Sequence, residues 1–196
     1  MRVAIFYDRK GWAWWNKSHE IKKHLSPDIQ MDIISVDEKF DPYVYDLFLL
    51  FDGYLIEQLP YLPRNRVIVG CSNARLIADA IRITDQYNCL ALYANNAPVL
   101  DAHRYRENLY CCQNGVDSAL FHVPKDRTDA FIACWVGNTK NIANKGLDLI
   151  QESCRSTANP LIALDVYACE HDSSVLWTHE QIRDHIYYNS AFYVCA

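Results

Sequence analysis

The sequence contains no apolar run close to the ~20 residues that a helix needs to cross a bilayer. It also has no excess of basic residues, since 19 lysines and arginines stand against 24 aspartates and glutamates and the formal net charge is -5. Met1 leads directly into a strand-like run, so the charged and apolar regions of a signal peptide are missing as well. These absences predict a cytoplasmic protein whose overall charge does not attract nucleic acid.

Several signatures of metal and nucleotide sites are also missing. The eight cysteines include no Cys-x-x-Cys pair, and the adjacent Cys111 and Cys112 would point to opposite faces of a strand. The chain has no Gly-x-Gly-x-x-Gly dinucleotide fingerprint, no Walker loop and no Gly-x-Ser-x-Gly elbow. We therefore expect free thiols, no metal site and no bound cofactor.

What the sequence does contain is an alternation of short apolar runs with helix-like segments, the pattern of a parallel sheet covered by helices on both faces. Many of the runs are apolar throughout, as in strands that are buried on both sides. We predict an α/β fold with Rossmann-like parallel sheets. The expected strands are 2–7, 30–36, 46–51, 66–70, 89–93, 109–112, 131–136, 161–166 and 191–195, and the expected helices are 18–25, 73–87, 97–104, 147–154 and 179–188.

The chain is predicted to contain two domains, separated by a polar, proline-containing stretch at 123–129. The first domain covers residues 1–124 and is long enough to fold as a unit. The second covers residues 125–196, contains only three of the expected strands and two of the expected helices, and stops inside a strand-like run. We expect this second domain to be incomplete and the chain to be a fragment or a truncated product.

One segment of the second domain has the chemistry of an anion site. Gly137, Asn138 and Lys140 follow an expected strand, and Lys145 stands just before the helix expected from residue 147. A helix N-terminus offers unpaired N–H groups and the positive end of its dipole, and lysines add charge. From these residues alone, a phosphate or diphosphate site and a solvated capping loop are equally supported.

A series of motifs extends over residues 110–196 in a particular order. They are Asn114-Gly115-Val116-Asp117, Leu120-Phe121, Pro124, Trp135-Val136-Gly137-Asn138, Asn144-Lys145-Gly146-Leu147-Asp148-Leu149-Ile150 and the segment 178–196. Together they resemble the second domain of glycosyltransferases with the GT-B fold, family four. In the first domain the resemblance rests on the initial strand and on Gly11-Trp12-Ala13.

The resemblance implies transfer of a sugar from a nucleotide-diphosphate sugar to an acceptor, with retention of configuration and without a metal. It assigns Lys145 to the donor diphosphate, Gly137 and Asn138 to a close backbone approach, and Lys140 to a further contact. Asn138 stands where the family usually has an arginine, so a charge-assisted contact is missing there. The family's paired glutamates fall beyond residue 196, so no catalytic residue is assigned and the chain alone is expected to have little transferase activity.

The segment 8–17 holds three of the five tryptophans next to basic residues. We assign Gly11, Trp12 and Trp14 to the acceptor side of the site. The tryptophans could instead pack under the loop, or lie at a membrane interface with the neighbouring lysines as a peripheral contact. The acceptor is unknown; by analogy it is a cell-surface polysaccharide or its lipid-linked precursor.

Two other classes stay open. One is a non-catalytic protein that binds nucleotides or sugars, or serves as a scaffold, and has kept the GT-B fold without its activity. The other is a different enzyme of GT-B type, such as a sugar-nucleotide epimerase or a phosphorylase. Replacement of Lys145 by alanine separates a working diphosphate site from a structural loop.

Overall fold

The computed structural model describes residues 1–95, 102–103, 105–120, 132–138, 146–156, 163–169, 178–188 and 192–193. The chain divides into two compact units, Met1–Gly115 and Val116–Ala196. This division precedes the domain boundary that the sequence places after residue 124. Within the described residues, no helix has the length and apolar character needed to span a membrane.

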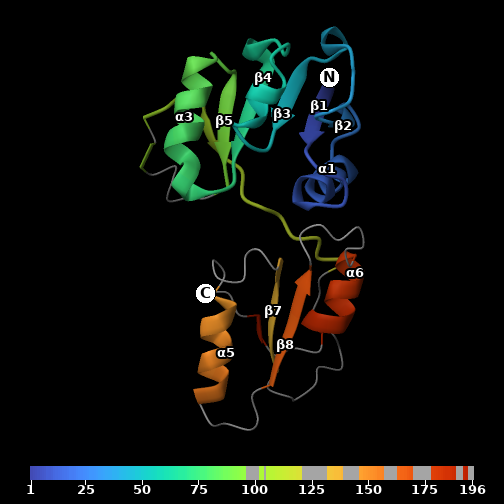
Figure 1. The fold of residues 1–196 in the computed structure, drawn as a ribbon. Helices are drawn as coiled ribbons and strands as arrows, with labels where there is room; N and C mark the ends of the chain where they lie inside the picture. Colours follow the sequence, from blue (N-terminus) through green and yellow to red (C-terminus); the bar gives the residue numbers. More distant parts are fainter. Residues whose placement is uncertain are drawn as a thin grey trace. The chain divides into compact units, whose positions relative to one another are not determined.

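The first unit alternates strands with helices along the chain (Figure 1). Its strands are β1 (Arg2–Tyr7), β2 (Gln30–Ser35), β3 (Leu47–Leu50), β4 (Val67–Cys71), β5 (Ala91–Ala94) and β6 (Leu109–Cys111). The α-helices described in this unit are α1 (Ala13–Lys23), α2 (Leu55–Gln58) and α3 (Ile77–Gln86), and single 3-10 turns occupy Pro42–Val44, Arg64–Arg66 and Ala74–Leu76.

The six strands form one open sheet in the order β2-β1-β3-β4-β5-β6, and neighbouring strands pair in parallel. This arrangement confirms the predicted α/β fold with a Rossmann-like parallel sheet. Strand β1 lies between β2 and β3, so the order of the strands reverses at the β1/β3 pair. Because the strands are parallel, their carboxyl ends all meet at the same edge of the sheet.

Helices α1 and α3 pack on opposite faces of this sheet. Ile21 of α1 packs with a cluster that includes the buried Val3 and Ile5. Ile83 of α3 belongs to the larger cluster on the other face, together with Val69 and Leu92. Both faces are therefore covered by apolar contacts, as expected for strands that are apolar throughout.

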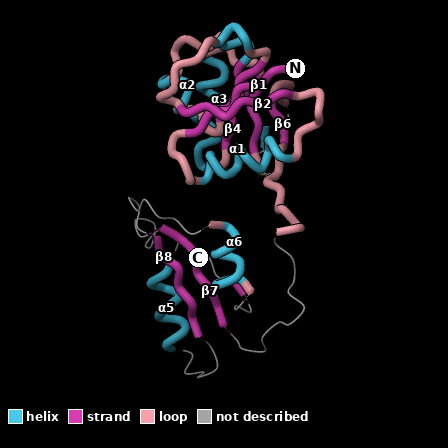
Figure 2. The backbone as a smooth tube through the Cα atoms, turned by 90° about the vertical axis from the view of Figure 1, so that its right-hand side faces the viewer, coloured by secondary structure: helices cyan, strands magenta, loops and turns pink. Residues whose placement is uncertain are grey.

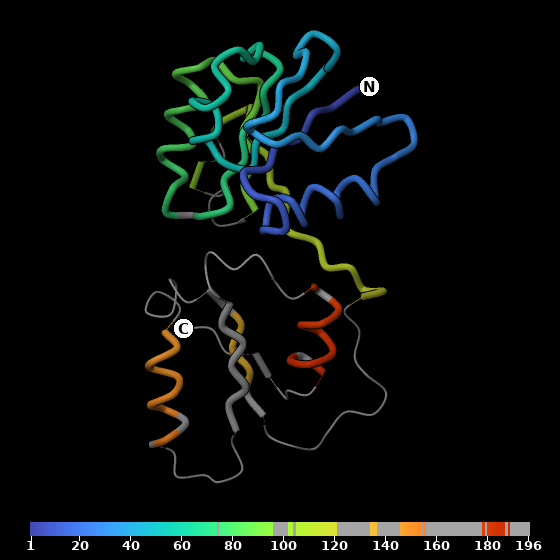
Figure 3. Tube along the Cα trace, turned by 45° about the vertical axis from the view of Figure 1, so that its right-hand side comes forward, coloured from blue at the N-terminus to red at the C-terminus, as the bar shows by residue number. Residues whose placement is uncertain are grey.

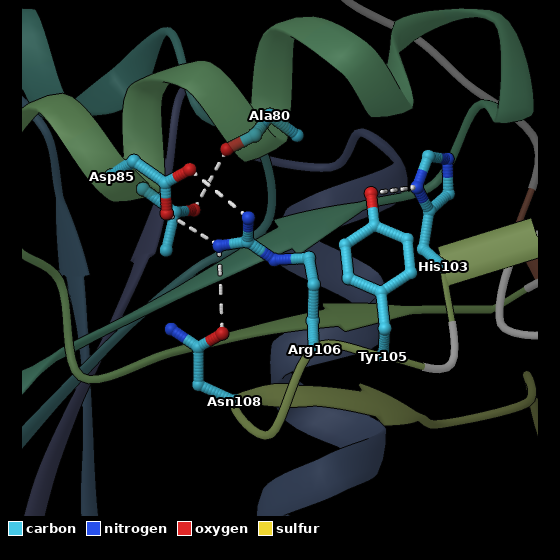
Figure 4. Close-up of polar contacts among 7 residues, drawn as sticks. Ala80, Asp85, His103, Tyr105, Arg106 and Asn108 are labelled. Atoms are coloured by element: carbon cyan, nitrogen blue, oxygen red, sulfur yellow. Dashed lines mark hydrogen bonds and ion pairs between the residues drawn. The ribbon is translucent and has the colours of Figure 1, made fainter.

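A polar contact ties the end of α3 to the segment before β6 (Figure 4). The Arg106 Nη1 atom donates to Asp85 Oδ2 at 3.0 Å, and Nη2 donates to Asp85 Oδ1. The same Nη2 lies 3.5 Å from Asn108 Oδ1. The guanidinium is mostly buried whereas the carboxylate is half exposed, so the carboxylate neutralises a cation that water reaches poorly.

The second unit contains a parallel sheet in the order β8-β7-β9, formed by β7 (Ile132–Asn138), β8 (Ala163–Cys169) and β9 (Phe192–Tyr193). Its described helices are α5 (Leu147–Ser156) and α6 (His179–Ile182), the latter continuing into a π-helical turn at Arg183–Tyr187. In the view of Figure 2, α5 and α6 lie on either side of β7 and β8, and Figure 3 draws α5 in orange and α6 in red. Trp135 of β7 is fully buried.

The expected strands are confirmed, with ends shifted by a few residues, whereas the helices differ more. Helix α1 begins at Ala13 instead of residue 18, and α3 begins at Ile77 after a 3-10 turn instead of at residue 73. Helix α2 was not expected, and most of the helix expected over 97–104 lies outside the described residues. The early start of α1 follows from tertiary packing, because weak helix propensity at two tryptophans is outweighed by their contacts.

Candidate functional site at the carboxyl edge of the first sheet

The loop after β1 is a defined turn. The Asp8 Oδ1 atom accepts a hydrogen bond from Arg9 N at 2.8 Å, and the Arg9 guanidinium lies 4.7 Å from the ring centroid of Trp12. Gly11 has φ +79, a conformation that favours glycine, and its carbonyl accepts from Asn16 Nδ2 at 3.1 Å. No atom lies within 4 Å of the position that a Cβ of Gly11 would take, so the glycine serves the turn and not a close contact.

The tryptophans assigned to the acceptor side occupy different environments. Trp14 packs against Phe51 and Tyr54, with ring centroids 6.1 Å and 5.6 Å away, and it touches both apolar clusters of the unit. Trp12 precedes α1, and its ring lies against Arg9. Trp14 is therefore a packing residue, whereas Trp12 belongs to the loop at the sheet edge.

Two carboxylates follow neighbouring strands where the strand order reverses. Asp8 comes directly after β1, and Asp52 comes shortly after β3. Burial, and then the charges of Asp8 and Asp52, raise the pKa of Tyr54. In open α/β sheets, ligands bind outside the carboxyl ends of the strands at such a reversal. The fold and these side chains together make this edge the candidate site of the first unit.

The next strand at this edge contains a glycine that is required by its neighbours. A Cβ on Gly70 would lie 2.6 Å from Tyr93 Oη and 2.7 Å from the carbonyl oxygen of Phe51. Burial, and then the charges of Cys112, Asp52 and Cys71, raise the pKa of Tyr93, so its phenol stays protonated and can donate a hydrogen bond.

A cation from α1 also reaches this edge. Lys17 Nζ donates to Asn114 Oδ1 at 2.7 Å and lies 5.4 Å from the ring centroid of Phe51. Burial lowers the pKa of Lys17, while the neighbouring Cys112 acts in the opposite direction. The ammonium is thus partly removed from water and held by a neutral amide and an aromatic ring.

Sequence patterns do not single out Lys17, Asn114 and Tyr93 as one group. Lys17 stands in the basic and aromatic segment 8–17, which is a signal for the loop but not for this lysine. Asn114 reads as part of a turn, and Tyr93 reads as an ordinary strand residue. The sheet brings them to one edge, and no spacing along the chain reports that.

In the second unit the structure describes part of the expected diphosphate site. Gly137 and Asn138 are the last residues of β7 and pair in parallel with Ala168 and Cys169 of β8, so they lie at the carboxyl edge of that sheet. Gly146 has φ +61, and its carbonyl accepts from Ile150 N at 3.0 Å at the start of α5. Lys140 and Lys145 lie outside the described residues.

A separate pocket of about 550 Å³ lies at the edge strand β2. Its lining includes Lys22, Asp32, Phe40 and Tyr45. Asp32 Oδ2 already accepts hydrogen bonds from Arg2 Nη2 at 2.8 Å and from the Tyr45 hydroxyl at 2.9 Å. These bonds mark the Asp32 network as a structural support of the edge strand.

The chain was compared with protein families and with curated proteins. No family model matches the chain, and no curated protein matches it.

Proposed function

We propose that this chain functions as a glycosyltransferase of GT-B type, or as part of one, that takes its sugar from a nucleotide-diphosphate donor. The observation that carries the proposal is the connection from β7 to α5. It leaves the carboxyl edge of a parallel sheet at Gly137-Asn138 and enters a ten-residue helix through Gly146, whose φ is +61. A strand that ends at the carboxyl edge of a parallel sheet and is followed by a helix N-terminus is where protein backbones bind phosphate groups.

The chemistry of the reaction explains the residue types. As the bond between sugar and diphosphate breaks, negative charge grows on the leaving diphosphate, and donors aimed at that charge lower the barrier. In the proposal, the first N–H groups of α5 and the ammonium of Lys145 supply these donors, with Lys140 as a second cation. Gly137 and Asn138 allow the diphosphate to approach the backbone. The reaction retains configuration and uses no metal.

The proposal assigns the acceptor to the carboxyl edge of the first unit. Gly11 and Trp12 belong to the loop after β1 at this edge. Trp14, two residues further along the chain, packs on Phe51 and anchors the start of α1. A cell-surface polysaccharide or its lipid-linked precursor is the acceptor class that we propose.

Titration calorimetry with UDP, GDP and ADP tests the donor site on the 196-residue chain and on Lys145→Ala. We expect at least one diphosphate to bind, and the substitution to weaken it about 10-fold or more, as for loss of a charged contact of about 1.5–3 kcal/mol. Lys39→Ala removes an exposed lysine of the first unit and serves as the control. Absence of binding, or equal affinity in Lys145→Ala and the parent chain, would contradict the proposal.

A second measurement separates transfer from binding alone. Release of free nucleotide from UDP- or GDP-sugars, followed with and without candidate acceptors, reports turnover. Diphosphate binding that depends on Lys145, together with nucleotide release that depends on an acceptor, supports a transferase. Because the chain alone is expected to have little transferase activity, Lys145-dependent binding without release agrees equally with part of a transferase and with the non-catalytic binding protein.

A further inference from the structure

Lys17, the cation at the carboxyl edge of the first sheet, differs from other partly buried cations of this unit in the group that it contacts. Arg2 pairs with Asp32 at 2.8 Å, and Arg106 pairs with both oxygens of Asp85. Lys17 instead contacts the neutral Asn114 Oδ1 and the ring of Phe51, and within the described residues no carboxylate forms an ion pair with it. A partly desolvated ammonium without a counter-ion is unfavourable by itself and gains from an anionic ligand.

The lysine is held in place for such a ligand. Helix α1 supplies the stem, and Asn114, which is 97 residues further along the chain, accepts one of its three N–H bonds. The ring of Phe51 lies below the ammonium and is itself almost fully buried, so it cannot move aside. Among the residues that the structure describes, no other hydrogen bond of the Lys17 ammonium is present, so its remaining N–H groups can donate to a ligand.

A second donor lies in the same neighbourhood. Phe51 adjoins both groups: the Lys17 ammonium lies 5.4 Å from its ring centroid, and its carbonyl oxygen and the Tyr93 hydroxyl lie 2.7 Å and 2.6 Å from the position that a Cβ of Gly70 would take. The Tyr93 hydroxyl is fixed above Gly70, where a side chain of any size would collide with it. A cation and a protonated phenol that adjoin the same residue are suited to an oxyanion.

The acidic groups of this edge limit where the anion can lie. The charge of Asp52 raises the pKa of Tyr54, Tyr93 and Cys71, and the charge of Asp8 raises the pKa of Tyr54. An anion at this edge is attracted by the Lys17 ammonium and repelled by the Asp52 carboxylate. The Asp52 carboxylate therefore lowers the affinity of this edge for an anion.

From this arrangement we infer that the carboxyl edge of the first sheet binds the carboxylate or phosphate group of a small substrate through Lys17 and Tyr93. Under the proposed function, on which this step rests, the same edge is the acceptor site, and the acceptor is then an anionic carbohydrate. Binding of the anion to this edge does not itself depend on the donor site in the second unit.

The test compares three probes on the 196-residue chain by NMR titration: glucose 6-phosphate, glucuronate and uncharged glucose. Both anions should bind at millimolar concentration more tightly than glucose, and the stronger of the two identifies phosphate or carboxylate as the preferred group. Lys17→Met should weaken the binding of both anions at least 10-fold and leave the binding of glucose unchanged. Tyr93→Phe should weaken anion binding severalfold. Asp52→Asn should strengthen the binding of both anions, because a repelling charge is removed.

Lys22→Met is the matched control, since it removes an exposed lysine from the same helix. The inference is overturned if the anions bind no better than glucose, if Lys17→Met leaves their affinity unchanged, or if Lys22→Met reduces it equally. Diphosphate binding measured on Lys17→Met separates the two proposals. Loss of anion binding with intact diphosphate binding supports this inference, whereas a chain that binds anions through Lys17 but never binds diphosphate contradicts only the proposed function.

Discussion

The phenol of Tyr93 occupies the space into which any side chain at Gly70 would project. A Cβ on Gly70 would lie 2.6 Å from Tyr93 Oη and 2.7 Å from the backbone oxygen of Phe51. The phenol could be displaced, but the Phe51 backbone directly follows β3 and cannot move without disturbing the end of that strand. The pair therefore fixes both the sequence at residue 70 and the position of a donor at the sheet edge.

Gly70→Ala should lower the free energy of unfolding by about 2 kcal/mol or more, because overpacking against a strand backbone is costly. Urea unfolding of the parent chain and the variant measures this difference. Gly53→Ala is a graded comparison, since the three atoms nearest its Cβ would all belong to the Ile83 side chain, with the flexible Cδ1 end closest at 3.0 Å. Gly115→Ala, with no atom within 4 Å of the new Cβ, should be close to neutral. Equal costs for all three substitutions would contradict the assigned role of Tyr93 and Phe51.

Gly11→Ala should be destabilising for a different reason. The residue has φ +79 and nothing near its Cβ, so the cost is backbone strain of about 1–2 kcal/mol and not a collision. Gly11→Asn should cost less, because asparagine tolerates this region of φ better than alanine. Thermal unfolding of the two variants ranks them, and an alanine variant as stable as the parent would show that the turn is not required.

Asp85→Asn should lower the free energy of unfolding by about 1–2 kcal/mol, since it leaves the mostly buried Arg106 without its counter-ion. Hydrogen bonding from Arg106 lowers the pKa of Asp85 below 3.8. The stabilisation is therefore complete above the unfolded pKa near 3.8 and is lost as the pH falls through the folded value. Unfolding measured from pH 7 down to pH 3 should show the difference between parent and variant shrinking.

Asp79→Asn on the same helix is the control for that series. Asp79 lies 3.6 Å from Arg82, and both side chains are exposed, so its loss should change stability by less than about 0.5 kcal/mol. A larger effect at Asp79 than at Asp85 would overturn the assigned role of the Arg106 pair.

Lys17→Met should stabilise the chain at pH 7 while removing the anion site. Burial lowers the pKa of Lys17 from 10.5, so folding disfavours the charged ammonium. The resulting loss of stability is fully present below the folded pKa and is relieved as the pH rises through that value towards 10.5. The melting temperature of Lys17→Met should thus exceed that of the parent at pH 7, with a smaller difference at pH 10, and Lys22→Met should show neither effect.

Much of the fold could be predicted from local patterns. Continuous apolar runs such as Arg2–Tyr7 and Val67–Cys71 indicate buried parallel strands, and both are found close to their expected places. Thr178 precedes α6 and caps it locally, because its Oγ1 accepts a hydrogen bond from Gln181 N at 3.2 Å. The start of α1 was misplaced because the packing of Trp14 on Phe51, which no local pattern contains, extends that helix.

The candidate site could be predicted only in part. Gly11 and Trp12 were expected at the acceptor side, and the structure places both in the loop after β1. Trp14 was expected beside them but packs into the apolar clusters. Lys17 and Tyr93 could not be identified because their environment depends on strands that are distant in sequence.

The sequence by itself determined the alternation of strands and helices, the apolar character of the strands and the turns at Gly11 and Gly146, since these depend on residues a few positions apart. Only the tertiary structure decided the strand order, the burial of Lys17 and the requirement for glycine at position 70. Burial and close contact arise when distant segments pack, and the free energy of a charged or bulky side chain is set by those neighbours.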